Sequence, residues 1–143
     1  MDPLVLRRDS HLKKDRGPIS VPTYMQDLAF QDDCIEQLES FLDHHDAWLV
    51  PVTATPVFRH LQPTRYLEDS PIYDTPLQVG KKALPYWVAT VSFVSIFSLT
   101  ESPVVTLPIG RDQAGMPIGI QVVGKRFSDL ELLKIAKTID RLK

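Results

Sequence analysis

The sequence predicts an α/β fold, in which helices cover a β-sheet. Three patterns indicate it: two strand-like runs joined by a turn over 104–123, a helix with start signals after residue 127, and an amphipathic helix near the beginning. The chain has 143 residues, which is enough for one domain. We divide it into a polar lead-in, 1–21, expected to be poorly ordered, and a domain portion, 22–143.

The first helical pattern opens at Pro22 and runs to about His44. Its apolar side chains recur mostly at three, four or seven residues, and acidic side chains fill the other side, as in a helix with one buried face. The apolar stripe consists of Tyr24, Leu28, Ile35, Leu38, Phe41 and Leu42.

A short apolar run over 47–52 predicts a buried strand that ends at Pro51 or lies at a sheet edge, because proline cannot donate to a ladder. Residues 53–75 show no period, and a loop of this length is typically functional or packed against another part. Thr75 and Pro76 then predict the start of a helix. After Pro85 we expect one buried apolar helix over 86–99.

Two strand-like runs, 104–109 and 118–123, flank the turn-rich residues 110–115 and predict a β-hairpin. Gly119 lies inside the second run, where a glycine suggests that another element approaches closely.

The last helix has the clearest local signals. Ser128 followed by Glu131 predicts a capping box, and Phe127 packing on Leu132 predicts a hydrophobic staple. The expected buried stripe consists of Leu132, Ile135, Ala136, Ile139 and Leu142.

Composition excludes several classes of function. The net charge of −2 gives no electrostatic basis for binding nucleic acid. The longest apolar stretch, 86–99, is shorter than the ~20 residues of a membrane span, so we expect no membrane partner. Cys34 is the single cysteine and no secretory signal is visible, which together favour a cytoplasmic location.

We find no complete active site, no metal site and no cofactor motif in the sequence. His44 and His45 are adjacent and point about 100° apart on a helix, so they suit the helix terminus better than a metal. Ser92, Ser95 and Ser98 repeat every third residue, but no nucleophile elbow surrounds them. Cys34 has no activating neighbour, which favours a buried thiol.

Several segments, in order, resemble the amidase signature family, most strongly over 97–142. The segments are Asp46–Pro51, Phe97–Pro103, Leu107–Gly110, the run Gly-Met-Pro-Ile-Gly-Ile-Gln over 115–121, and Phe127–Leu133. Two positions depart from the family pattern. Ser98 stands where asparagine is usual, and Glu101 stands where a glycine, which tolerates a positive φ, is usual.

The resemblance implies a partial mixed β-sheet with covering helices, the C-terminal part of the family fold. It also implies hydrolysis of carboxamides by a serine nucleophile, with a lysine that acts through a second serine and an oxyanion held by backbone N–H groups. The family's lysine and its Gly/Ser-rich stretch have no counterpart in these residues, so no catalytic residue is assigned. Candidate substrate-binding positions are Thr53, Phe97 and Ser98.

Three functional hypotheses follow. In the first, the chain is the C-terminal fragment of an amidase, where it completes the sheet and the wall of the substrate cleft. Its partners would be a small-molecule amide and a separate N-terminal amidase half. In the second, it is a stand-alone binding or interaction module derived from the family. In the third, His44, His45 or the serines form a hydrolytic site of their own.

Overall fold

The computed structural model describes residues 18–67 and 69–142, and the chain divides into two compact units, Met1–Gln31 and Asp32–Lys143. Helix α2 (Val21–Leu42) begins in the first unit and ends in the second. The Oγ atom of Ser20 accepts a hydrogen bond from the N–H of Thr23 at 3.3 Å, as an N-cap does. The predicted helix is therefore present, with its start one residue before Pro22. Most of the predicted lead-in, 1–17, lies outside the described residues.

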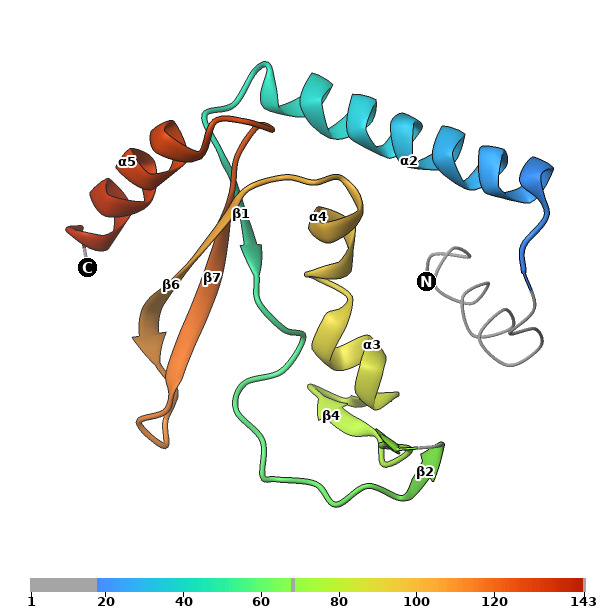
Figure 1. Ribbon diagram of the computed structural model, residues 1–143. Helices are drawn as coiled ribbons and strands as arrows, with labels where there is room; N and C mark the ends of the chain where they lie inside the picture. Colours follow the sequence, from blue (N-terminus) through green and yellow to red (C-terminus); the bar gives the residue numbers. More distant parts are fainter. Residues whose placement is uncertain (1–17, 68, 143) are drawn as a thin grey trace. The chain divides into compact units, whose positions relative to one another are not determined.

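A three-stranded antiparallel sheet lies at the centre of the second unit (Figure 1). Its order is β1 (Trp48–Pro51), β7 (Pro117–Val123) and β6 (Val104–Arg111). The predicted hairpin is thus present as β6 and β7. Pro51 is the last residue of β1, at the sheet edge, as its missing N–H requires.

One face of this sheet carries the core of the unit. Trp48, Val123 and Val104 lie opposite one another, and Val50 lies opposite Gln121, so these side chains share a face. The buried cluster on this face joins the end of α2 to helix α4 (Ser95–Leu99), and its members are Leu38, Leu42, Val50, Phe97 and Val123.

The apolar segment 86–99 forms two short helices, α3 (Tyr86–Val91) and α4, where one was predicted. The carbonyl of Phe93 accepts a hydrogen bond from Nε2 of Gln121 at 2.9 Å, while the N–H of Phe97 bonds to Val94. Helical hydrogen bonding is therefore interrupted between α3 and α4. The second amide hydrogen of Gln121 goes to the carbonyl of Pro51 at 2.8 Å, so one buried side chain joins β1, β7 and the helix junction.

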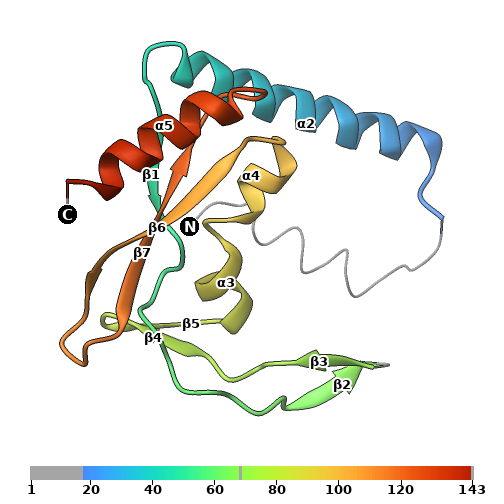
Figure 2. The ribbon, with the colours of Figure 1, turned by 60° about the vertical axis from the view of Figure 1, so that its left-hand side comes forward.

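Helix α5 (Asp129–Asp140) packs on β6 and β7, on the side of the sheet away from α4 (Figures 1 and 2). Leu132 and Ala136 are buried, as the predicted stripe requires, but Leu142 is 81% exposed.

The predicted capping box and staple are wrong. The Oγ atom of Ser128 donates backwards to the carbonyl of Lys125 at 2.7 Å and caps no N–H of α5. Phe127 has a φ of 63° and is 88% exposed, so its ring is turned away from Leu132 and lies against the guanidinium of Arg126.

Residues 53–84 contain two small hairpins. Strands β2 (Arg65–Leu67) and β3 (Ser70–Ile72) form one, and β4 (Leu77–Val79) and β5 (Lys82–Leu84) form the other. The helix predicted from Thr75 and Pro76 is therefore wrong. Gly80 adopts a φ of 60° at the turn between β4 and β5, which reverses the chain where a helix would continue.

Candidate functional site

An open hollow of about 880 Å³ lies at the end of β1, on the sheet face that also carries the core. The segment 51–58 forms one side, and the far ends of β6 and β7 form another. Most of its lining is apolar, with hydroxyls from threonines and tyrosines and one histidine. The lining residues outside 51–58 are His60, Leu61, Tyr73, Tyr86, Thr106, Pro108, Pro117, Ile118 and Gly119.

The segment after β1 is held in place by backbone contacts. The N–H of Ala54 donates to the carbonyl of Ala89 in α3 at 2.9 Å. The hydroxyl of Thr53 donates to the carbonyl of Thr55, which closes a tight local turn. The first bond holds this wall of the hollow against α3, and the second fixes its local turn.

Gly119 makes close packing possible at the base of the hollow. A Cβ atom at this position would lie 3.3 Å from Cγ2 of Val52 and 3.5 Å from the carbonyl oxygen of Leu107. The sequence-based expectation of a close approach at Gly119 is confirmed, and the approaching element is the chain that follows β1.

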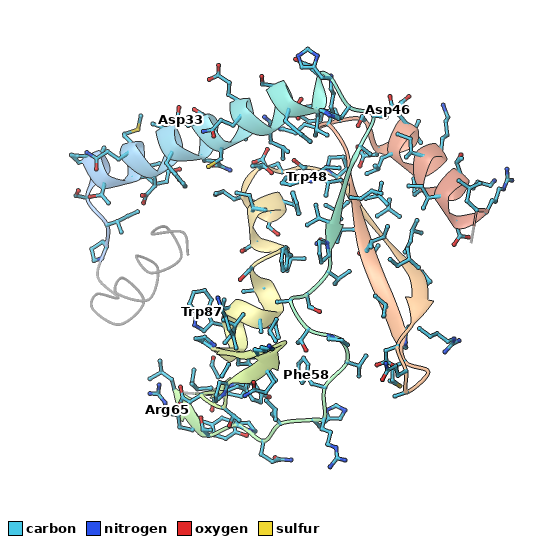
Figure 3. The ribbon with its side chains drawn as sticks, turned by 180° about the vertical axis from the view of Figure 1, so that it is seen from behind. Asp33, Asp46, Trp48, Phe58, Arg65 and Trp87 are labelled. Carbon is cyan, nitrogen blue, oxygen red and sulfur yellow. The ribbon has the colours of Figure 1, made fainter. Side chains whose placement is uncertain are left out.

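Three aromatic rings form one side of the hollow. Tyr86, at the start of α3, stacks on Tyr73 with 4.8 Å between ring centroids. Phe58 meets Tyr86 edge-on at 6.0 Å. Figure 3 shows Phe58 on the loop that follows β1. Stacked rings give a rigid apolar surface of the kind that binds uncharged organic groups.

Of the three candidate binding positions, Thr53 lines the hollow. Phe97 is 3% exposed and packs edge-on against Trp48 in the core, with 5.8 Å between centroids. Ser98 is exposed on α4, and its N–H bonds to the carbonyl of Val94. Neither Phe97 nor Ser98 is among the described residues that line the hollow.

Sequence reasoning did not identify Phe58, His60, Tyr73 or Tyr86 as lining residues. The available signal was the long segment 53–75, which was expected to be functional but has no period to show which side chains converge. Tyr73 and Tyr86 meet through the fold of the two hairpins, which no local pattern predicted.

Three of the histidines and serines considered for catalysis, His45, Ser92 and Ser95, have structural partners. Nδ1 of His45 lies 2.8 Å from the carbonyl of Phe41 and its ring stacks on Phe41, which places it at the end of α2. The hydroxyls of Ser92 and Ser95 donate to the carbonyls four residues earlier. Within 18–67 and 69–142, no cluster of three or more histidine, cysteine or acidic residues could hold a metal ion.

Burial raises the pKa of the Cys34 thiol, and the negative charge of Asp33 raises it further. A raised pKa disfavours the thiolate, the reactive form. The predicted buried thiol is half-buried in the structure.

Glu101 has a φ of 56°, in the left-handed region that favours glycine. Its carboxylate accepts a hydrogen bond from Nη2 of Arg126 at 3.0 Å. The position where the family usually has glycine thus keeps the glycine-like backbone, and the glutamate forms an ion pair with the turn before α5.

Comparison with known proteins identifies the family. A family model described as "Amidase" matches residues 9–133, which begins within the predicted lead-in. A fatty acid amide hydrolase of Oryza sativa subsp. indica is 30% identical over 80 residues, 56% of this chain. A glutamyl-tRNA(Gln) amidotransferase subunit of Leptospira interrogans (serovar copenhageni) is 27% identical over 107 residues, 75% of this chain.

The fold is similar to that of a solved structure. A crystal structure of an amidase matches 82% of this chain with a TM-score of 0.64 and 24% sequence identity. The matched regions make up a minor part of each relative: 13% of the rice enzyme, 18% of the Leptospira protein and 24% of the solved amidase chain. None of the helices in the described part of the chain is both long and apolar enough to cross a membrane.

Proposed function

The chain belongs to the amidase family, and we propose that it forms the C-terminal part of an amidase that hydrolyses carboxamide C–N bonds. In this proposal the sheet β1–β7–β6 and its helices complete the fold, and the hollow at the end of β1 forms one wall of the substrate cleft. The observation that carries the proposal is the convergence of Gly119, Thr53 and the rings of Tyr73 and Tyr86 on that hollow.

The lining favours an amide with an apolar acyl or aryl group. Stacked tyrosines and prolines supply apolar contact area, and hydroxyls near the base can hydrogen-bond an amide. Phe97 would support the wall of the cleft indirectly, by packing in the core. Ser98 would contact the substrate or another part of the enzyme from the exposed side of α4.

The nucleophilic serine, its partner serine and the lysine would come from a part of the amidase outside residues 1–143, which is a separate N-terminal half in one version of the proposal. A general base beside the nucleophile and preorganised N–H donors are what acyl transfer from an amide requires. We place the protein in the cytoplasm, which the single cysteine supports.

The test starts with the coding DNA upstream of this chain. An amidase-like reading frame with a lysine and a Gly/Ser-rich segment is expected there, or in a separate gene. The 143-residue chain and the reconstituted protein are then assayed on a panel of simple alkyl and aryl amides. The proposal is supported if the reconstituted protein hydrolyses amides and the 143-residue chain does not.

A matched pair of variants tests the hollow. Gly119→Val in the reconstituted enzyme should raise KM for aryl amides or abolish turnover, because the new side chain meets Val52 and the Leu107 carbonyl. Gly110→Val, where a Cβ meets nothing within 4 Å, is the control on β6. Equal effects of the two variants would contradict the placement of the cleft at this hollow. Saturable binding of an amide without turnover would instead favour the second hypothesis, a binding module.

A further inference from the structure

Two hollows of similar size differ in the charges that line them. The first, at the end of β1, has no aspartate, glutamate, lysine or arginine among its described lining residues, and His60 supplies the only side-chain nitrogen there. The second, of about 800 Å³ beside α5, is lined by Asp43, Asp46 and Glu131, together with one lysine and two histidines. The two hollows therefore suit ligands of different charge.

The loop that carries His60 is basic. Residues 51–67 contain two arginines and His60 but no aspartate or glutamate. Arg65 is paired with Asp74, whereas Arg59 has no ion-pair partner among the described residues. A cationic group in the first hollow would thus find no carboxylate among the described lining residues, whereas an anionic group would find the positive charge of Arg59 nearby.

The side chain of His60 is turned to the first hollow and is available to a ligand. Phe58 and His60 both line the hollow, and Arg59 between them does not. An extended segment imposes this alternation, since every second side chain lies on the same side. His60 is exposed, and its ring nitrogens have no hydrogen-bond partner among the described residues. Its N–H is therefore free to donate to a ligand.

The aromatic rings beside His60 indicate what shape of ligand fits. Tyr86 stacks on Tyr73 and meets Phe58 edge-on, so rings from different parts of the chain form one continuous surface. A further aromatic ring can pack on this surface in the same stacked or edge-on manner. Phe58 and His60 lie two residues apart, which is roughly 6–7 Å in an extended segment. A benzene ring that carries a carboxylate bridges this spacing.

We propose that the first hollow selects an aromatic amide whose ring carries a carboxylate. The ring packs against Tyr86 and Phe58, and the N–H of His60 donates to the carboxylate, with the charge of Arg59 beside it. His60 is then the specificity-determining residue of the hollow. The part of the hollow in amide hydrolysis rests on the proposed function, whereas the selection rests on the charges and rings of the lining.

Three acetanilides that differ in one substituent test this selection: para-acetamidobenzoate, para-methylacetanilide and para-(aminomethyl)acetanilide. The dissociation constant of each compound for the 143-residue chain is measured, without turnover, by NMR titration of the aromatic signals of the protein. The carboxylate compound should bind at least about fivefold more tightly than the methyl compound, because it gains a hydrogen bond to a charged group. The cationic compound should bind most weakly.

The matched variants are His60→Leu and His44→Leu. Both histidines are exposed, and His44 lines the second hollow. His60→Leu should weaken binding of the carboxylate compound at least about fivefold and that of the methyl compound less than about twofold. His44→Leu should change both affinities less than about twofold. His60→Gln keeps a side-chain N–H, so it should retain the affinity for the carboxylate compound within about threefold.

Three results would overturn the proposal: equal affinity for the carboxylate and methyl compounds, equal weakening by the two leucine variants, or equal loss of both compounds in His60→Leu. If the reconstituted enzyme hydrolyses amides but the chain lacks this order of affinity, the selection fails and the proposed function stands. If the order and its dependence on His60 are found but no amide is hydrolysed, the selection stands and the proposed function fails.

Discussion

The sheet region and the segment 53–84 are stabilised in different ways. In the sheet region, Val50, Phe97 and Val123 are 7%, 3% and 0% exposed and come from distant parts of the chain. In 53–84, Leu77 is the single buried residue among those described. Local polar contacts hold that segment, such as the pair between Arg65 and Asp74 at 2.9 Å. Burial thus stabilises the sheet region, whereas short-range polar contacts stabilise the segment 53–84, which supplies much of the lining of the first hollow.

The largest expected effect tests this contrast directly. Phe97→Ala removes a buried ring that packs against Trp48 and the core, so it should lower the free energy of unfolding by about 3–5 kcal/mol. Leu67→Ala, on exposed β2, should change it by less than about 0.5 kcal/mol. Urea unfolding of the 143-residue chain measures both. Similar losses for the two variants would erase the distinction between the regions.

The second prediction concerns the buried side-chain amide of Gln121. Gln121→Met keeps the length of the side chain but leaves the carbonyls of Pro51 and Phe93 without their donor. Both hydrogen bonds are part-buried, so water can reach the freed carbonyls in part, and a loss of about 1–2 kcal/mol is expected in urea unfolding.

Gln113→Met is the control, because Gln113 is exposed in the turn between β6 and β7. If Gln121→Met were neutral, the junction of α3 and α4 would not depend on this amide, and another cause for the break would be needed.

The same contrast explains which elements the sequence could predict. β1, the hairpin β6–β7 and the helices α2 and α5 followed from apolar spacing and turn residues. Their predicted burial holds only in part: Leu38 and Leu42 are the buried residues of α2, and Val50 is the buried residue of β1.

The break between α3 and α4 did not follow from such patterns, because it depends on Gln121, which is distant in the sequence. The β4–β5 hairpin was missed because Thr75 and Pro76 carry a helix-start signal, whereas Gly80 reverses the chain.

The candidate site was predictable only in part. Thr53 was a candidate because it follows the segment Asp46–Pro51, which resembles the family pattern, and it lines the hollow. Tyr73 and Tyr86 converge because two hairpins bring them together, and the spacing of either residue carries no sign of it. Gly119 was identified as a point of close approach because glycine inside a strand has few other reasons.

The third prediction has the opposite sign to the first two. Phe127 is 88% exposed with a φ of 63°, a conformation that is unfavourable for a bulky residue. Phe127→Gly should therefore raise the free energy of unfolding by up to about 1 kcal/mol, after loss of the contact with Arg126. Phe127→Ala, which keeps the backbone strain, is the comparison. Destabilisation by Phe127→Gly would contradict this prediction and would favour the hydrophobic staple of Phe127 on Leu132.

The smallest expected effect tests whether exposed polar contacts matter within the sheet region. Asp43, at the end of α2, accepts a hydrogen bond from Nζ of Lys125, and this bond, with the charge of Lys125, holds the pKa of Asp43 below its ordinary 3.8. A lowered pKa means that the contact stabilises the fold above the unfolded-state pKa. That contribution disappears as the pH falls through the lower, folded-state value.

Asp43→Asn should therefore lower the urea midpoint slightly at pH 7, and the difference from the unsubstituted chain should vanish in strong acid. Added salt should shrink the effect at pH 7, because both groups are solvent-exposed. In a Lys125→Met background, Asp43→Asn should lose this pH dependence. A difference that persists in acid, or survives without Lys125, would mean that Asp43 stabilises the end of α2 through some other contact. Exposed polar contacts would then stabilise the sheet region as well as the segment 53–84.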